Sequence, residues 1–169
     1  MTIASYVFGA FAILALFWAY QQKNRHRLII SKLSADVLWA SHYFCLGAYG
    51  GMIPNFVGIL RELVFLERDK KRWASSAFVP VFFILVNFGL GLYTFENPIN
   101  IIPIAASSIV TVSLWLRRPN LTKILSIPVS VAFLIYDYFV RSYLGMLNES
   151  IAIISIILYF IKGRKSKNE

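Results

Sequence analysis

The chain has 169 residues, of which 58% are hydrophobic and only 15% are charged, and its formal net charge is +9. This composition excludes an ordinary soluble domain, because soluble domains carry about 25% charged residues. The basic residues stand at the ends of long apolar runs, where membrane proteins place them, so the positive charge does not indicate nucleic-acid binding. The composition predicts a protein whose main solvent is lipid.

Seven apolar runs follow one another along the chain, each close to the length that crosses a membrane. Lipid offers no water to backbone amides, and the runs lack the alternation of barrel strands, so each is predicted to be a helix. The sequence therefore predicts an all-α membrane protein with seven transmembrane helices. The predicted spans are residues 6–20, 28–49, 52–66, 73–95, 99–116, 124–140 and 145–161.

Three details of this chain order need an interpretation. The first run has no preceding charge and no small-residue cleavage site, so it is interpreted as a retained helix rather than a signal peptide. The second and third runs are separated by Gly50 and Gly51, and the sixth and seventh by residues 142–145, which predicts two tight hairpins. Gly47 and Gly51 have the spacing of closely packed membrane helices, although at a turn Gly51 is expected to serve the turn itself.

The basic residues lie almost entirely on one side of the predicted topology. Fifteen belong to that side, whereas Arg141 alone belongs to the other. The positive-inside rule then predicts a bacterial inner-membrane protein with its N-terminus outside and its C-terminus in the cytoplasm. The fifteen are Lys23, Arg25, Arg27, Lys32, Arg68, Lys70, Lys71, Arg72, Arg117, Arg118, Lys123, Lys162, Arg164, Lys165 and Lys167.

The sequence contains an internal repeat at a separation of 94 residues. Because three helices and one linker helix separate the copies, both point the same way through the membrane. The predicted organisation is a three-helix repeat over residues 1–72, a linker helix over 73–96, and a second repeat with a basic tail over 97–169; chance similarity of two hairpins stays open. The shift brings Tyr49 onto Tyr143, Gly51 onto Gly145, Met52 onto Met146, Ile59 onto Ile153, Phe44 onto Tyr138 and Trp39 onto Phe133.

Several motifs resemble the YgjV-type bacterial inner-membrane proteins over nearly the whole chain. They are Leu38-Trp39-x-x-His42-Tyr43-x-x-Leu46-Gly47-Ala48, Gly50-Gly51-x-x-x-Asn55, Leu60-Arg61, Asn97-Pro98-x-Asn100 and Tyr143-x-Gly145. That family is similar in turn to the SWEET, SemiSWEET and PQ-loop group, whose plan of three helices, one linker and three helices (3+1+3) matches the predicted one.

The wider resemblance implies a solute path between the repeats, with an asparagine on each third helix and an aromatic residue on each second helix facing the substrate. The matching positions are Asn55 and Trp39 in the first repeat, and Glu149, with Asn148 beside it, and Phe133 in the second. The Pro-Gln pair of the PQ-loop group is absent from the first helix, where Tyr20-Gln21 stands, so the gating mechanism of that group does not transfer.

Ionisable residues inside the predicted spans cost a few kcal/mol each, so each needs a partner or a wet cavity. Asp36 and Arg61 lie at similar depth on either side of the Gly50 hairpin, with Glu62 at the same level, which predicts a structural ion pair that clamps two helices. Asp137 and Glu149 each stand six residues from Tyr143. Their shared depth fits a proton relay, or one of them pairs with Arg141 or faces outer water.

The predicted substrate-binding residues come from both repeats. His42 joins them because it lies one turn from Trp39 and, by the shift, opposite Tyr136; a hydrogen-bonded packing role is the alternative. The predicted set is Trp39, His42, Asn55, Phe133, Tyr136, Asp137, Asn148 and Glu149.

The predicted function is a transporter or facilitator that moves a small polar solute or ion by alternating access. Cys45 is a lone cysteine in an apolar run, and the chain has no zinc spacing, phosphate loop or nucleophile elbow, so no metal, cofactor or enzyme activity is predicted. Its expected partners are membrane lipid and the solute, with no nucleic acid, and homo-oligomerisation stays open. The alternatives are a non-transporting scaffold or regulator, and an intramembrane enzyme with carboxylates and His42 converging within about 3 Å.

Overall fold

The computed structural model describes residues 3–93 and 97–165, with side chains described to residue 161. Within these ranges the chain forms seven α-helices and three short 3-10 helices, so the all-α prediction is confirmed. The ends of the predicted linker helix and basic tail lie outside the described residues. The α-helices are α1 (Ile3–Gln21), α2 (Arg25–Leu46), α3 (Tyr49–Leu66), α4 (Phe78–Tyr93), α5 (Ile101–Trp115), α6 (Pro119–Phe139) and α7 (Tyr143–Lys165), and the 3-10 helices are η1 (Glu67–Asp69), η2 (Trp73–Ser75) and η3 (Pro98–Asn100).

The turn between α2 and α3 lies earlier than the sequence predicted. Gly47, not the Gly50-Gly51 pair, ends α2, with a φ of 69° in the left-handed region that favours glycine. The backbone N–H groups of Gly47 and Ala48 donate to the carbonyls of Phe44 and Tyr43. Gly50 and Gly51 therefore belong to the first turn of α3, and the expectation that Gly51 serves the turn is wrong.

The two remaining boundary differences also follow from local hydrogen bonding. Trp73–Ser75 forms η2 rather than the start of α4, because Ser76 has an extended backbone and its side chain accepts from the N–H of Phe78. The second hairpin is likewise shorter than predicted, since α7 begins at Tyr143. Ser142 accepts from the N–H of Gly145 there, so Gly145 lies in the first turn of α7.

Four helical segments are long and apolar enough to cross a membrane: Ile3–Gln21, Pro98–Trp115, Pro119–Phe139 and Tyr143–Ile161. The apolar helix Phe78–Tyr93 is shorter. The helices α2 and α3 are not among the four, because Lys32 and Asp36 in α2 and Arg61 and Glu62 in α3 lower their hydropathy. All four of these side chains are largely buried inside the bundle, so the charged side chains of α2 and α3 face other helices rather than lipid.

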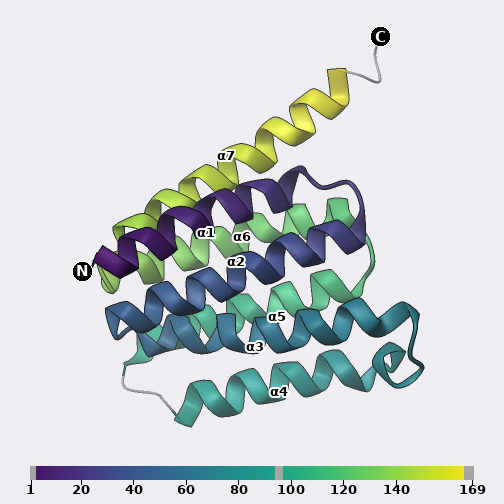
Figure 1. Cartoon of the computed structure of the whole chain (residues 1–169), viewed down its shortest axis with the longest axis horizontal. Coiled ribbons are helices and arrows are strands. Elements are labelled where there is room, and N and C mark those ends of the chain that lie inside the picture. Colours follow the sequence, from purple (N-terminus) through teal and green to yellow (C-terminus); the bar gives the residue numbers. More distant parts are fainter. Residues whose placement is uncertain (1–2, 94–96, 166–169) are drawn as a thin grey trace.

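Six of the helices form a closed ring. Each packs against the next in the order α1, α2, α3, α5, α6, α7 and back to α1, while α4 packs outside the ring against α3 and α5. In Figure 1, α1, α2 and α3 lie towards the viewer, α5 and α6 lie behind them, and α4 forms the lower edge. If α1 is exchanged with α5, α2 with α6 and α3 with α7, each ring helix keeps the same neighbours in the ring.

The helix boundaries repeat at the separation found in the sequence. Pro119 begins α6 94 residues after Arg25 begins α2, and Tyr143 begins α7 94 residues after Tyr49 begins α3. The continuous helical stretch Pro98–Trp115 likewise follows α1 at nearly the same separation. The correspondence therefore extends to the first helix of each set, which the sequence shift aligns only through general hydrophobicity.

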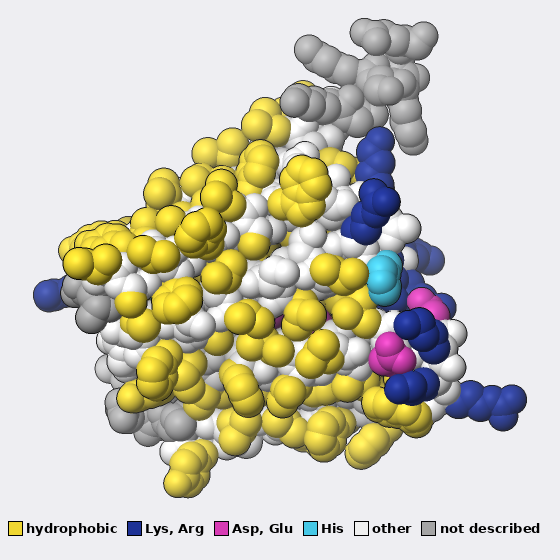
Figure 2. Space-filling view, in the orientation of Figure 1, with side chains coloured by type: hydrophobic (Ala, Val, Ile, Leu, Met, Phe, Trp, Pro, Cys, Tyr) yellow, Lys and Arg dark blue, Asp and Glu magenta, His cyan; other side chains and the backbone are white. Residues whose placement is uncertain are grey.

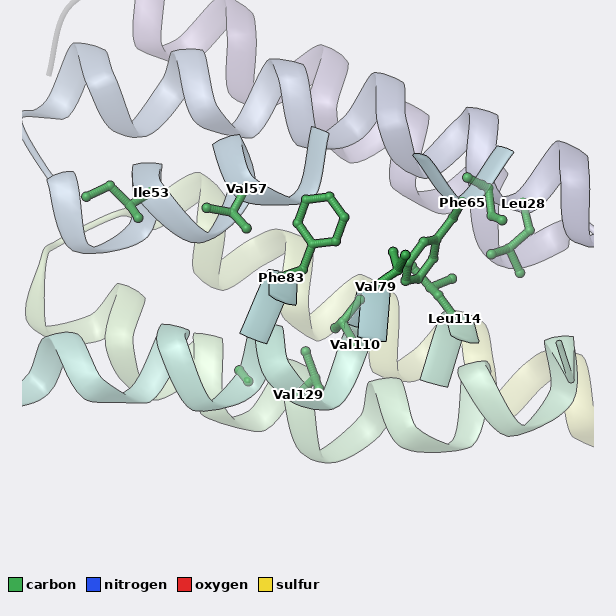
Figure 3. Close-up of a cluster of buried hydrophobic side chains, with 11 residues drawn as sticks. Leu28, Ile53, Val57, Phe65, Val79, Phe83, Val110, Leu114 and Val129 are labelled. Carbon is green, nitrogen blue, oxygen red and sulfur yellow. The ribbon is translucent and has the colours of Figure 1, made fainter. Parts of the chain in front are cut away.

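The largest apolar core cluster joins α3, α4 and α5 to their neighbours (Figure 3). Phe65 is fully buried, and its ring centroid lies 6.3 Å from that of Phe83 and 5.4 Å from that of Trp115. In lipid, such packing stabilises through van der Waals contact rather than through removal of apolar surface from water. The cluster consequently holds α4 onto the ring, and its members Val110 and Val129 reach the ring's centre.

The charged surface residues gather at one end of the bundle, where α1 meets α2, α3 meets α4 and α5 meets α6 (Figures 1 and 2). Hydrophobic side chains cover the middle of the face shown in Figure 2. Two residues that the sequence analysis counted among the connecting charges are misplaced, because Lys32 lies inside α2 and Lys123 lies fully buried in α6, which starts earlier than predicted. Nine basic residues whose side chains the structure describes remain on that side, so the charge asymmetry persists.

Candidate functional site

A cavity of about 60 Å³ lies at the centre of the ring and is bordered by all six ring helices. This volume has room for about four to six water molecules. Apolar and polar side chains share its wall, and the polar ones come from both three-helix sets. The lining residues are Leu16 and Tyr20 of α1; Lys32, Asp36, Trp39 and Tyr43 of α2; Pro54, Asn55 and Arg61 of α3; Ser107 and Val110 of α5; Ser126, Val129, Ser130 and Phe133 of α6; and Glu149 of α7.

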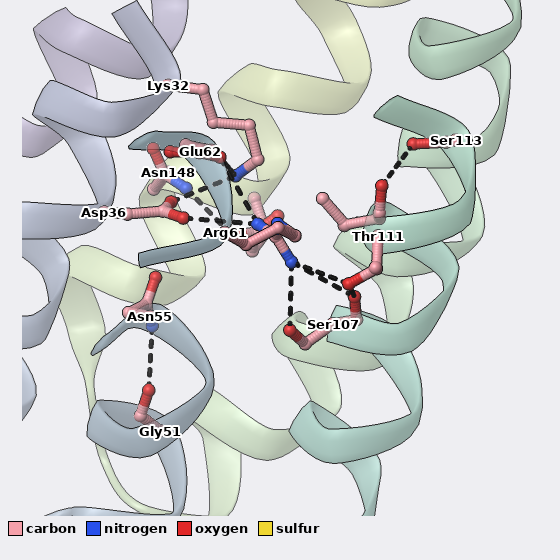
Figure 4. A network of polar contacts seen from close by, with 12 residues as sticks. Lys32, Asp36, Gly51, Asn55, Arg61, Glu62, Ser107, Thr111, Ser113 and Asn148 are labelled. Carbon is pink, nitrogen blue, oxygen red and sulfur yellow. Dashed lines mark hydrogen bonds and ion pairs between the residues drawn. The ribbon is translucent and has the colours of Figure 1, made fainter. Parts of the chain in front are cut away.

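One side of the cavity is a charged network between α2 and α3 (Figure 4). The Arg61 guanidinium lies 3.6 Å from a carboxylate oxygen of Asp36 and 3.3 Å from one of Glu62. The Lys32 ammonium lies 3.0 Å from Asp36, one helical turn away, and 4.0 Å from Glu62. Two cations and two carboxylates therefore balance one another within this pair of helices.

Arg61 also extends across to the second three-helix set. Its Nη1 donates to the hydroxyl of Thr111 at 2.9 Å, and to the hydroxyl and the backbone carbonyl of Ser107, both at 3.4 Å (Figure 4). The carbonyl of Ser107 also accepts from the Thr111 hydroxyl. The two terminal nitrogens of the planar guanidinium thereby meet α2 on one side and α5 on the other, which suits arginine better than lysine.

Four of the eight predicted substrate-binding residues line the cavity: Trp39, Asn55, Phe133 and Glu149. Asn55 donates to the carbonyl of Gly51 at 2.7 Å, and Glu149 accepts from the side-chain amide of its neighbour Asn148 at 2.8 Å. The indole N–H of Trp39 is buried and has no hydrogen-bond partner among the described residues. An unmet donor at the wall of a cavity is a group that a bound molecule or water can satisfy.

The other four predicted residues, His42, Tyr136, Asp137 and Asn148, are not among the cavity-lining residues. Three of them, His42, Tyr136 and Asp137, form an outer seal with Tyr43. The Tyr43 hydroxyl donates to Asp137 at 2.7 Å, and its ring contacts that of Tyr136 with centroids 6.2 Å apart. The ring nitrogens of His42 contact the carbonyl of Ser5 at 2.8 Å and the hydroxyl of Ser142 at 3.0 Å. His42 therefore meets no carboxylate at hydrogen-bonding distance, and the geometry required for the enzyme alternative is not found among the described residues.

A second, larger cleft of about 490 Å³ lies on the far side of this seal. The turn from α2 to α3 and the segment from Asn97 to Asn100 border it, together with Tyr136. Tyr43 faces the central cavity and Tyr136 faces the cleft, so these two touching rings separate the two spaces. Gly51 packs against both rings, because a Cβ atom there would lie about 3 Å from each.

The comparison with known families gives one match, and it covers almost the whole chain. Residues 3–167 match the profile of Imp-YgjV, a family described as bacterial inner membrane protein. The chain belongs to this family. No curated protein and no solved structure matches the chain. The resemblance drawn from the sequence motifs is confirmed for the Imp-YgjV family, and no match shows the wider similarity to the SWEET group.

The Imp-YgjV motifs quoted from the sequence fall on both spaces and on the seal between them. Trp39, Asn55 and Arg61 line the central cavity, whereas Gly50 borders the outer cleft. Tyr43, in the same motif, contributes both to the cavity wall and to the seal. Part of each long motif therefore shapes the interior of the bundle, whereas Leu60 and Tyr143 of the quoted motifs are exposed.

Sequence reasoning missed three contributors to the Imp-YgjV interior. Lys32 was counted as a connecting charge, although its spacing of four residues from Asp36 is typical of a helical ion pair. Tyr43 stands 94 residues before Asp137, its hydrogen-bond partner, so the repeat shift itself could have found the pair. Ser130 lies 94 residues after Asp36 and would have been found in the same way.

Proposed function

We propose that this chain is a multi-pass transporter or facilitator of the bacterial inner membrane, without enzyme activity, that moves a small polar solute or ion through the central cavity. The cavity carries this proposal, because all six ring helices border it and polar residues of both three-helix sets line it, among them Asn55 and Glu149. Polar groups are costly in lipid, so a protein places them in its centre to meet something polar.

The proposed mechanism is alternating access between two parallel three-helix repeats joined by α4, in a SWEET-like 3+1+3 arrangement. The helix boundaries at a separation of 94 residues and the exchangeable packing order of the ring support it. In this state, the seal of Tyr43 and Tyr136 separates the cavity from the outer cleft. Opening that seal on one face, and the helix ends on the other, would expose the cavity to each side in turn.

The proposed orientation places the N-terminus outside and the basic end of the bundle in the cytoplasm. The nine described basic residues of that end against Arg141 at the other support this assignment, since the positive-inside rule counts lysine and arginine in short connections. In this orientation, the cleft bordered by Asn97 and Tyr136 faces the periplasm.

The test is osmotic swelling of vesicles that contain the purified protein, in a panel of glycerol, urea, glycine and methylammonium chloride. At least one solute should enter faster than into protein-free vesicles. At equal protein content, Asn55→Ala and Glu149→Gln should slow that entry by about tenfold or more, the equivalent of about 1.4 kcal/mol of lost interaction.

Ser150→Ala is the matched control, because Ser150 is exposed beside Glu149 and bonds only its own helix, at Met146. It should swell at the parent's rate. The proposed function is wrong if no solute in the panel enters faster than into protein-free vesicles, or if both cavity variants match the parent. A non-transporting scaffold or regulator would then be the better interpretation.

A further inference from the structure

The interior charges of the two helical hairpins do not balance in the same way. In the hairpin of α2 and α3, Lys32 and Arg61 neutralise Asp36 and Glu62 through direct contacts. The hairpin of α6 and α7 contributes two further carboxylates to the interior, Asp137 and Glu149. None of the ion pairs among the described side chains includes either of them.

The hydrogen bonds at these two carboxylates come from neutral groups. The Tyr43 hydroxyl donates to Asp137 and the Asn148 amide donates to Glu149. The titratable groups that face Glu149 are Tyr20 of α1, Lys32 and Tyr43 of α2, and Asp137 of α6. Lys32 is the only cation in that set, and it already contacts Asp36 and Glu62.

Two uncompensated carboxylates buried among the helices of a membrane protein would cost several kcal/mol each. A positive charge that joins them removes much of this cost. Within the described residues no group of three or more histidine, cysteine, aspartate or glutamate side chains gathers to hold a metal ion. A monovalent charge therefore fits this pair better than a coordinated divalent metal.

A second observation at the same cavity indicates a ligand. Trp39 lines the cavity with only 5% of its surface exposed, and its buried indole N–H has no hydrogen-bond partner among the described residues. The indole can only donate, so the missing partner carries a hydrogen-bond acceptor. The cavity of about 60 Å³ limits such a molecule to a few heavy atoms in this state.

We propose that Glu149, together with Asp137, holds one positive charge while the cavity is loaded, supplied by a proton or by the ammonium group of a small solute whose acceptor meets the Trp39 indole. This inference rests on the proposed function, because it names the charge that accompanies the cargo. Lys32 stays with the α2–α3 network, and the second hairpin carries the exchangeable charge.

The experiment measures the reaction of dicyclohexylcarbodiimide, an apolar reagent to which protonated carboxyl groups add, with the protein in lipid nanodiscs. Peptide mass mapping assigns the modified residue. The modification should fall on Glu149 or Asp137 and should slow as the buffer becomes alkaline, by up to about tenfold for each pH unit once the carboxyl is mostly ionised. Glu149→Gln and Asp137→Asn, each checked for a monodisperse elution profile, should remove the corresponding modified peptide.

Methylammonium chloride at constant pH and ionic strength distinguishes the two sources of charge. Protection of the carboxyl by methylammonium, with sodium chloride as the control salt, indicates that the solute brings the charge, whereas pH dependence without protection indicates a proton. Modification of Asp36 or Glu62 instead, or a rate insensitive to both pH and methylammonium, overturns the inference. Vesicles without solute entry would refute the proposed function, yet the labelling result would still report on the charge site.

Discussion

The two helical hairpins of the bundle have helices that begin 94 residues apart, yet their interior chemistry differs. In the half of the bundle towards its basic end, α2 and α3 carry four charged side chains that contact one another. The positions 94 residues later in α6 and α7 carry three hydroxyls and one apolar side chain, all buried. The pairs are Lys32 and Ser126, Asp36 and Ser130, Arg61 and Ser155, and Glu62 and Ile156.

Towards the other end, the chemistry is reversed. Asp137 and Glu149 in the second hairpin stand where the first has the neutral Tyr43 and Asn55. The charges of the first hairpin thus neutralise one another within that hairpin. The second hairpin contributes carboxylates whose hydrogen-bonding partners are neutral. A repeat preserves the backbone path, so the departures from it show where each copy has a separate task. We expect removal of charge to destabilise the first hairpin and to leave the second unharmed.

Arg61→Leu should cause the largest loss of stability. The change leaves Asp36 and Glu62 buried with Lys32 as their remaining cation, and breaking a buried ionic network in this way costs about 3–5 kcal/mol. Chemical unfolding in detergent micelles, followed by tryptophan fluorescence, measures the free energy of unfolding. Ser155→Ala is the matched control in the second hairpin, where the loss of the bond from Gln21 should cost about 0.6 kcal/mol.

The double variant Arg61→Leu with Glu62→Leu separates charge balance from the loss of a large side chain. It restores equal numbers of cations and carboxylates in the network, so it should be more stable than Arg61→Leu alone. An equal or greater loss in the double variant would show that packing, not charge, accounts for the effect.

Gly145→Ala should be the next most harmful change. A Cβ atom at Gly145 would lie 2.4–2.6 Å from the carboxylate atoms of Asp137, compared with 2.9–3.0 Å from the rings of Tyr136 and Tyr43 at the equivalent Gly51. Overpacking of this kind costs about 1–3 kcal/mol. We expect Gly145→Ala to lose more unfolding free energy than Gly51→Ala, in the same assay.

Gly89 in α4 serves as the control for both glycine variants, since a Cβ atom there would meet nothing within 4 Å. Gly89→Ala should match the parent or exceed it slightly, because alanine favours the helix. If Gly51→Ala proved the more harmful of the two hairpin variants, the close fit of Gly145 against Asp137 would not control the second hairpin.

The smallest expected effect is that of Glu149→Gln, whose unfolding free energy should stay within about 0.5 kcal/mol of the parent or rise. Glutamine keeps the size of the side chain and removes a charge that makes no ion pair among the described residues. Asp36→Asn, the corresponding change in the first hairpin, should lose about 1–3 kcal/mol because it leaves Lys32 and Arg61 short of a carboxylate. Equal losses in the two variants would remove the distinction between the hairpins.

The helical class could be predicted from the sequence, since apolar runs of membrane-spanning length alternate with short charged segments. The family could be predicted from its motifs. Helix ends were harder, because Gly47 and Gly50 are both suitable near a turn and only the left-handed conformation at Gly47 decides between them. The interior was predicted in part. Depth placed Asp137 and Glu149 at one level, but the rotation of each helix, which depends on its neighbours, brings only Glu149 to the cavity.

The hydrogen bond between Tyr43 and Asp137 joins two positions that the repeat makes equivalent. When equivalent points of two related bodies touch, they lie at the axis that relates the bodies, and a rotation near that axis moves them least. Leu66 ends α3 fifteen residues beyond Gly51, which packs against Tyr43, so it lies about 22 Å along the helix from this contact. A tilt of about 10° there would shift the basic end of α3 by about 4 Å. The hydrogen bond between Tyr43 and Asp137 is thus placed to act as the fulcrum in the step in which the basic end of the bundle opens and the outer seal stays closed.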